Sequence, residues 1–214
     1  MLKVWGRKTS INVQKVMWAV AELGLPHERI DAGGAFGKVD TPEFAKLNPN
    51  RLVPVIDDGG FTLWESASIV RYLGHRYGSG TLAPLDTLDI ARADQWMEWA
   101  GTSLYGDIIS TVFWQLIRTP AAERKNEAVA ASIKRAGERL AILDAQLAGR
   151  SYILGEALTV ADIPAGALMY RYFTLSIDRP ALPNVEAWYA RLSARPAYRD
   201  HVMLDFSSLK VPGA

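Results

Sequence analysis

The chain has 214 residues, with 24 Lys and Arg against 23 Asp and Glu, and it contains no cysteine. The length suits one large domain or two small ones. Without cysteine there are no disulfides, thiolate metal clusters or cysteine nucleophiles, and the near-zero net charge gives no reason to expect nucleic acid as a partner. No apolar run approaches the roughly 18 residues of a membrane helix, and the first residues lack a secretory signal. We therefore expect a cytoplasmic protein with no membrane partner.

The first 80 residues alternate between strand and helix signals. Apolar residues recur at helical spacing between positions 13 and 20, Thr41 precedes a proline that favours a helix start, and Ser66 is placed to cap a third helix. Strands are predicted at residues 2–5, 27–31, 52–56 and 61–63, with a turn at 57–60 between the last two. The predicted order is β-α-β-α-β-β-α.

Beyond residue 80 the strong patterns are helical. Residues 81–86 contain Pro84 and are interpreted as a linker. Thr159 and Asp162 have the spacing of a capping box at the start of a later helix. We predict an α/β domain over residues 1–80 and an all-α domain over residues 87–214. One helix face is marked by Ile133, Ala136, Leu140, Leu143 and Leu147.

Common site motifs are absent. The sequence has no GxGxxG phosphate loop and no GxSxG nucleophile elbow. His27, His75 and His201 lie far apart without metal-ligand spacing, so we expect no metal site.

Three local segments are more informative together than apart. They are 10–16 (SINVQKV), at the start of the first helix; 48–55 (NPNRLVPV), with a proline inside a strand-like run; and 63–73 (LWESASIVRYL), at the start of the third helix. Their order and spacing resemble the glutathione S-transferase family, and the chain is most similar to bacterial serine-type members of the theta and nu classes. The resemblance implies a thioredoxin-like first domain, a helical second domain, a homodimer, and glutathione as co-substrate with no prosthetic group.

The resemblance implies that Ser10 and Asn12 are catalytic. A helix N-terminus carries roughly half a positive charge, which favours ionisation of a thiol placed there. The Ser10 hydroxyl would donate a hydrogen bond to the glutathione thiolate, and the Asn12 amide would supply a second donor. Two alternatives stay open: Ser10 is only the N-cap of the helix, or Thr9 provides the hydroxyl.

Four further residues are implied to hold glutathione. The resemblance predicts a cis Val53-Pro54 bond that leaves the Val53 backbone free to pair with the extended peptide. Glu65 would pair with the γ-glutamyl ammonium, and the Ser66 hydroxyl and its helix start would hold the adjacent carboxylate. The alternatives are an edge-strand proline at Pro54 and an ordinary helix start at Glu65-Ser66.

Lys38 and Arg51 are weaker candidates for the glycyl carboxylate. Family members often have glycine where this chain has Arg51, so arginine would be strained there if the turn required a positive φ. Lys38 lies in a glycine-rich loop and is equally well explained as a solvated lysine.

The second substrate is expected between the domains. The family implies a small hydrophobic electrophile and a role in detoxification. The alternatives are other glutathione-dependent reactions, namely peroxide or disulfide reduction, dehalogenation or isomerisation, and a non-catalytic interaction module with the same fold. A dense aromatic group either lines that acceptor site or packs in the core: Trp96, Trp99, Tyr105, Phe113 and Trp114.

Overall fold

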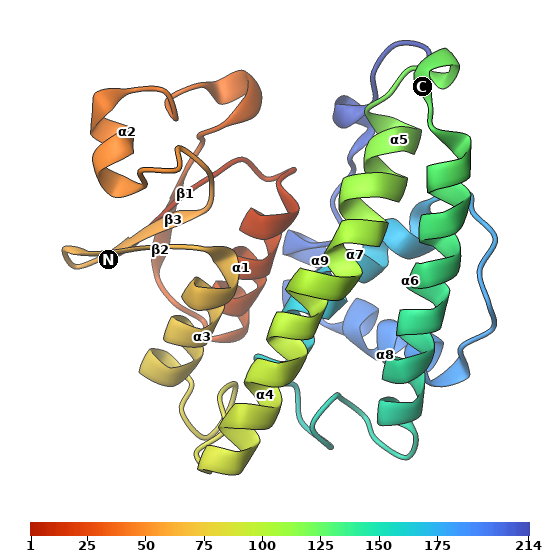
Figure 1. The fold of residues 1–214 in the computed structure, drawn as a ribbon. Coiled ribbons are helices and arrows are strands. Elements are labelled where there is room, and N and C mark those ends of the chain that lie inside the picture. Colours follow the sequence, from red (N-terminus) through yellow and green to blue (C-terminus); the bar gives the residue numbers. More distant parts are fainter.

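The computed structural model describes residues 1–214, and Figure 1 shows a sheet with its helices beside a larger group of helices. None of the helices combines the length and the apolar content that a membrane-spanning helix requires. The N-terminal elements run in the predicted order: β1 (Leu2–Trp5), α1 (Ile11–Glu22), β2 (His27–Ile30), α2 (Pro42–Leu47), β3 (Val55–Asp58), β4 (Phe61–Trp64) and α3 (Ser66–Tyr77).

The four strands form one mixed sheet in the order β2-β1-β3-β4. β1 and β2 are parallel and are joined through α1, whereas β3 pairs antiparallel with both β1 and β4. This topology is the thioredoxin-like arrangement expected for the first part of the chain. The register aligns Ile30, Trp5, Val55 and Trp64 across one end of the sheet.

The third predicted strand is wrong in its position. It was expected at residues 52–56, but β3 spans Val55–Asp58 because Val53-Pro54 is a cis peptide outside the ladder. Asp57 and Asp58 therefore belong to the strand, and the hairpin turn is the pair Gly59-Gly60, with φ values of 64° and 97°. Positive φ at both central residues is the requirement of a type I′ hairpin turn.

Ser66 does not cap α3 as predicted. It is the first residue of the helix, and Glu65 takes the cap position with φ 70° and ψ 116°. Thr41 does cap α2, since its Oγ1 accepts a hydrogen bond from the Phe44 N–H at 3.2 Å.

The C-terminal part is helical. α4 (Thr87–Trp99) continues through wide π-type turns at Ala100–Leu104 and Gly106–Phe113 into α5 (Trp114–Ile117). The remaining helices are α6 (Asn126–Leu147), α7 (Asp162–Thr174), α8 (Pro183–Ala194) and α9 (Pro196–His201).

The predicted capping box is present in part. The Asp162 carboxylate accepts from the Thr159 N–H at 2.9 Å, but the Thr159 hydroxyl donates to that same carboxylate at 3.3 Å instead of accepting from the helix. α7 accordingly begins at Asp162, after a turn through residues 160 and 161.

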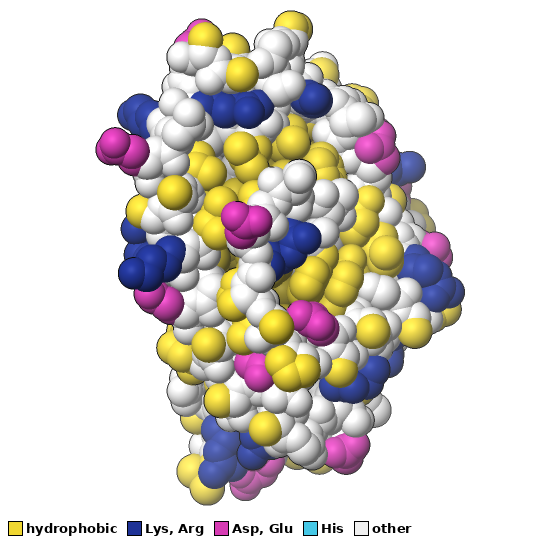
Figure 2. Space-filling view, turned by 90° about the vertical axis from the view of Figure 1, so that its right-hand side faces the viewer, with side chains coloured by type: hydrophobic (Ala, Val, Ile, Leu, Met, Phe, Trp, Pro, Cys, Tyr) yellow, Lys and Arg dark blue, Asp and Glu magenta, His cyan; other side chains and the backbone are white.

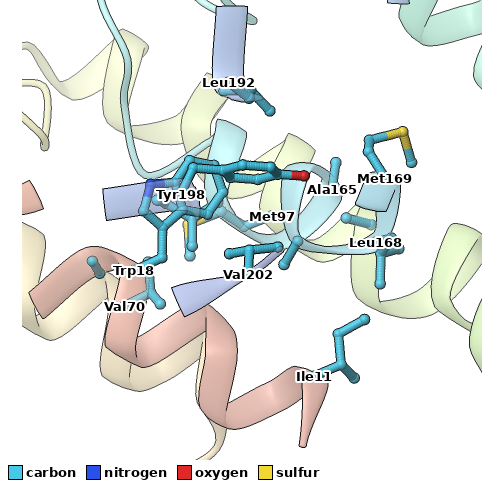
Figure 3. Close-up of a cluster of buried hydrophobic side chains, with 14 of the residues drawn as sticks. Ile11, Trp18, Val70, Met97, Ala165, Leu168, Met169, Leu192, Tyr198 and Val202 are labelled. Carbon is cyan, nitrogen blue, oxygen red and sulfur yellow. The ribbon is translucent and has the colours of Figure 1, made fainter. Parts of the chain in front are cut away.

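The main core joins both parts of the chain. One continuous cluster of 43 buried apolar residues includes side chains from α1, α3, α4, α7, α8 and α9. Figure 3 shows Trp18 of α1 directed toward Tyr198 of α9, and their ring centroids are 4.8 Å apart. On the face of the C-terminal helices in Figure 2, acidic and basic side chains are interspersed around a central stretch of hydrophobic ones. α1 thus lies between the sheet and the C-terminal helices (Figure 1).

Candidate functional site

The candidate site lies at the end of the sheet marked by Ile30, Trp5, Val55 and Trp64. Residues 6–10 follow β1 there, Val53-Pro54 precede β3, and Glu65-Ser66 follow β4. Because these four positions are aligned by the strand register, the three segments meet at one edge. The structure therefore brings together the parts of the sequence that carry Ser10, Val53 and Ser66.

The loop between β1 and α1 is anchored through its backbone. The loop begins at Gly6, where only glycine fits, because a Cβ at this residue would lie 2.3 Å from Val13 Cγ2. All five carbonyls from Gly6 to Ser10 accept hydrogen bonds. The Gly6 carbonyl accepts from the Arg29 side chain, and the Thr9 carbonyl accepts from the Arg171 side chain. The Arg7 carbonyl accepts from the Ser10 N–H, while those of Lys8 and Ser10 accept from the side chain and the N–H of Gln14. The positions of the Thr9 and Ser10 hydroxyls are thus fixed by bonds within the loop and by three surrounding elements, β2, α1 and α7.

Ser10 occupies the N-cap position of α1 without acting as a side-chain cap. Its backbone is extended, with φ −78° and ψ 120°, and its hydroxyl makes no capping hydrogen bond. The hydroxyl has no other hydrogen-bond partner within the protein, and the residue is partly exposed. Ser10 therefore presents a free donor at the positive end of a 12-residue helix. The hydroxyl of Thr9, its neighbour, is equally unpaired and partly exposed.

Asn12 has an amide whose orientation is fixed by its neighbours. Its Oδ1 accepts from the Lys15 ammonium at 3.0 Å and from the Ser66 hydroxyl at 3.4 Å. An ammonium can only donate, so the atom facing Lys15 must be the amide oxygen. The Asn12 NH₂ group is consequently turned away from Lys15, and the Asn12 side chain also hydrogen-bonds the Tyr105 phenol. This contact also joins the start of α1 to the start of α3.

Lys15 is a site residue that sequence reasoning missed. Its side chain is buried, with 5% exposure, and its ammonium lies 5.0 Å from the centroid of the Tyr105 ring. Burial lowers the pKa of Lys15 to about 8, and the negative charge of Glu65 opposes that shift. Lys15 therefore places a cation in contact with Asn12 and close enough to Glu65 for the two charges to interact. The sequence does contain one feature that could have indicated Lys15, a lysine inside the apolar run that forms α1.

Val53 and Glu65 have unusual backbones. The Val53-Pro54 bond is cis, and neither the N–H nor the C=O of Val53 takes part in a backbone hydrogen bond. Glu65 has a positive φ of 70° with an extended ψ of 116°, a combination that costs a non-glycine residue about 1–3 kcal/mol. The exposed Glu65 side chain forms no ion pair within the protein. Both residues thus offer unpaired polar groups at the same edge.

Lys38 and Arg51 lie apart from this group. Both are exposed, and neither forms a hydrogen bond or ion pair with Ser10, Asn12 or Ser66. Arg51 instead donates to the Asp40 carbonyl at 2.9 Å. Both residues have positive φ, 69° for Lys38 and 55° for Arg51, so the strain anticipated for arginine at this turn is present.

A pocket of about 780 Å³ opens beside the loop that carries Thr9. It is lined by that loop, by residues 34–36, by Arg118 after α5, and by the C-terminal residues 208–212. The five aromatic residues considered for the acceptor site are not part of its lining. Trp96 and Phe113 are buried in the core instead, whereas Trp114 is 50% exposed.

Comparison with known proteins decides the family. Residues 9–76 match the description "Glutathione S-transferase, N-terminal domain", and residues 105–196 match "Glutathione S-transferase, C-terminal domain". The chain belongs to the glutathione S-transferase family. It is 38% identical to glutathione S-transferase GstB of Escherichia coli K12, over 97% of this chain and 100% of that protein. It is 31% identical to glutathione S-transferase 3 of Zea mays, over 94% of this chain and 93% of that protein.

A solved glutathione S-transferase shares the whole architecture. It is the theta class enzyme of Xanthomonas axonopodis pv. citri, whose structure has glutathione bound. The two chains superpose with a TM-score of 0.90 at 43% identity, covering 95% of this chain and 98% of that one. The predicted family and its two-part fold, a thioredoxin-like first part and a helical second part, are therefore confirmed.

Proposed function

We propose that this glutathione S-transferase binds glutathione with its sulfur at the N-terminus of α1, where Ser10 stabilises the thiolate. The observation that carries the assignment is the Ser10 hydroxyl, which stands at the helix start without a capping partner. A hydrogen bond to a charged group contributes about 1.5–3 kcal/mol, equivalent to about 1–2 pKa units of the thiol. The Asn12 NH₂ group, which faces away from Lys15 and carries two N–H bonds, supplies a second donor.

The remaining site residues would hold the tripeptide. The unpaired Val53 backbone pairs with the extended chain of glutathione after the cis Val53-Pro54 bond. Glu65 binds the γ-glutamyl ammonium, and the start of α3 binds the adjacent carboxylate together with the Ser66 hydroxyl, which turns to it from the long 3.4 Å contact with Asn12 Oδ1. Lys38 and Arg51 are the cations for the glycyl carboxylate, supported by their exposed side chains, neither of which pairs with a carboxylate within the protein.

The thiolate would then attack a second, electrophilic substrate. The protein lowers the barrier by forming the nucleophile and by holding both reactants together.

We infer a detoxifying role in the cytoplasm on the strength of the family alone. We also infer a homodimer, which agrees with exposed apolar side chains on β4 and α4, where Phe61 is 49% and Leu88 is 65% exposed. Residues 1–80 would form the glutathione domain, 81–86 the linker and 87–214 the helical domain.

The thiolate mechanism is tested by the ultraviolet absorbance of bound glutathione titrated against pH. In the wild type we expect the thiol to ionise below its free pKa of about 8.5. In Ser10→Ala we expect the bound thiol pKa to rise by about 1–2 units. Thr9→Val is the matched control and should leave the pKa unchanged.

Four outcomes would contradict the assignment. An unshifted thiol in the wild type would remove the thiolate mechanism, and a failure to bind glutathione would remove the function. A pKa that rises in Thr9→Val but not in Ser10→Ala would transfer the role to Thr9. Turnover of peroxides or disulfides in preference to electrophiles would replace transfer by reduction.

A further inference from the structure

The pocket beside Thr9 has an unusual charge. Its lining contains five basic residues and one acid, Asp31. Asp31 is already paired with Arg29, with 2.6 Å between the Asp31 carboxylate and the Arg29 guanidinium. None of the other basic residues of the lining, Arg7, Lys8, Arg118 and Lys210, has a carboxylate within 4.0 Å. The pocket is thus strongly cationic, in a protein whose net charge is only +1.

A further arginine lies behind this lining. Arg171 of α7 is only 4% exposed and also has no carboxylate partner. Its guanidinium donates to the Thr9 carbonyl at 2.7 Å and lies 4.3 Å from the centroid of the Phe113 ring. Buried arginine is normally paired, because the desolvation of its charge is costly. Arg171 therefore holds a positive charge behind the pocket lining and fixes the loop that carries Ser10.

The arginines weaken each other's protonation. Burial, followed by repulsion from Arg118, lowers the pKa of Arg7. Burial lowers the pKa of Arg171 to about 10, with Tyr105 opposing the shift and Arg7 and Arg118 adding to it. Like charges gathered without a counterion destabilise the empty protein, and an anion bound among them would remove that penalty.

Glutathione itself is expected elsewhere. Its γ-glutamyl carboxylate is assigned to Ser66 and the start of α3, and its glycyl carboxylate to Lys38 and Arg51. The arginine pocket borders Thr9, next to the hydroxyl that would hold the sulfur, which is where the second substrate must lie to be attacked. Arg118 and Arg7 present planar guanidiniums, whose geometry suits a carboxylate.

Accepting the proposed function, we propose that the second substrate is a small electrophile bearing a carboxylate, which binds Arg7 and Arg118. The thiolate sulfur forms a bond to the electrophilic carbon, and the bond from that carbon to its leaving group breaks, with the electron pair leaving on the halide. The thiol proton has already gone to solvent when glutathione bound. The acceptor is then an anionic electrophile with a halide leaving group, not a purely hydrophobic one.

A matched pair of acceptors tests the inference: 4-chloro-3-nitrobenzoate and 4-chloro-3-nitrobenzamide. For each acceptor, kcat/KM is divided by its uncatalysed second-order rate with glutathione, which removes their difference in intrinsic reactivity. We expect the wild type to favour the benzoate by about tenfold or more, the effect of one charge-assisted hydrogen bond or a bidentate pair. Arg118→Gln and Arg7→Gln should lose this preference while keeping turnover of the benzamide. Arg92→Gln removes an exposed arginine of α4 outside the pocket and should keep the preference.

Several results would overturn the inference without touching the transferase function. These are equal use of both acceptors by the wild type, an undiminished preference in both variants, or turnover of neither acceptor by a protein that still ionises bound glutathione. A raised KM for glutathione with both acceptors in Arg118→Gln would also overturn it, since the arginines would then bind glutathione. Failure of the proposed function is detected separately, by the thiolate titration of the wild type.

Discussion

Lys15 is the only lysine that the fold buries; the other lysines are exposed. Its ammonium donates to the Asn12 amide oxygen at 3.0 Å and thereby fixes the orientation of that amide. The cost of burying it is visible in its pKa, which falls from 10.5 to about 8. A lysine with a lowered folded pKa binds fewer protons in the folded state than in the unfolded state across that interval. The contribution of Lys15 to the free energy of unfolding should therefore rise with pH between about 8 and 10.5.

Lys15→Met isolates that contribution, because it keeps the length of the side chain and removes the charge. We expect the free energy of unfolding of the wild type, minus that of the variant, to increase from pH 8 to pH 10.5. Urea unfolding at a series of pH values measures the difference, in which the titrations of tyrosines cancel. A difference that stays flat across this range would show that Lys15 is not desolvated.

The residues with positive φ show which backbone strain could be predicted from the sequence and which could not. Lys38, Arg51 and Glu65 are the three non-glycine residues with positive φ, and all three were candidates for binding glutathione. The strain at Arg51 was predictable because glycine is usual at that turn. The strain at Glu65 was not, because a Glu-Ser pair before an apolar run reads as an ordinary capped helix.

At the scale of elements, α1 shows why part of the site escaped prediction. Apolar spacing predicted one buried face, but the helix is buried from Val13 through Val20. It packs against α3 on one side and α7 and α9 on the other. Polar residues on its expected outer face, Gln14 and Lys15, are consequently enclosed. A periodic pattern describes one packing partner, and only the three-dimensional structure reveals the second.

The start of α7 was better predicted, because Thr159 and Asp162 lie close in sequence. The fully buried Asp162 carboxylate also accepts from the Ile153 N–H and the Trp188 indole, both at 3.0 Å. Burial raises the pKa of Asp162 to about 6, and its hydrogen bonds oppose that shift. These two additional partners were not predictable, since they lie 9 and 26 residues away.

Asp162→Asn should destabilise the protein by about 3 kcal/mol, because an amide NH₂ would face donors that a carboxylate oxygen now satisfies. The midpoint of urea unfolding at pH 7 measures the change. Asp200→Asn, at an exposed position, is the control and should stay within about 0.5 kcal/mol of the wild type. Equal stability of the two variants would mean that Asp162 is not the organising acceptor of this helix start.

For the whole molecule, the shared core makes the two parts interdependent. Glu22 of α1 joins them: its carboxylate accepts from the Arg195 guanidinium at 2.7 and 2.6 Å and from the Trp18 indole at 2.9 Å. The pair is partly shielded, with side-chain exposures of 33% for Arg195 and 11% for Glu22. We infer that the sheet and the C-terminal helices unfold together.

Glu22→Gln should lower the free energy of unfolding by about 1–3 kcal/mol, because charge-assisted hydrogen bonds are replaced by weaker ones. Calorimetry at fixed protein concentration should still show a single transition, shifted to lower temperature. Glu186→Gln, on the exposed side of α8, is the control. Two separate transitions in either protein would show that the parts unfold independently despite their common core.

The anchored loop before α1 has a consequence for the charge that forms in the reaction. Each backbone carbonyl from Gly6 to Ser10 already accepts a hydrogen bond, so none is free to turn its negative end toward a bound sulfur. Dipoles held in advance need no reorganisation when a proton leaves the thiol. The anchored backbone around Ser10 thus favours a negative charge at this position before any substrate binds.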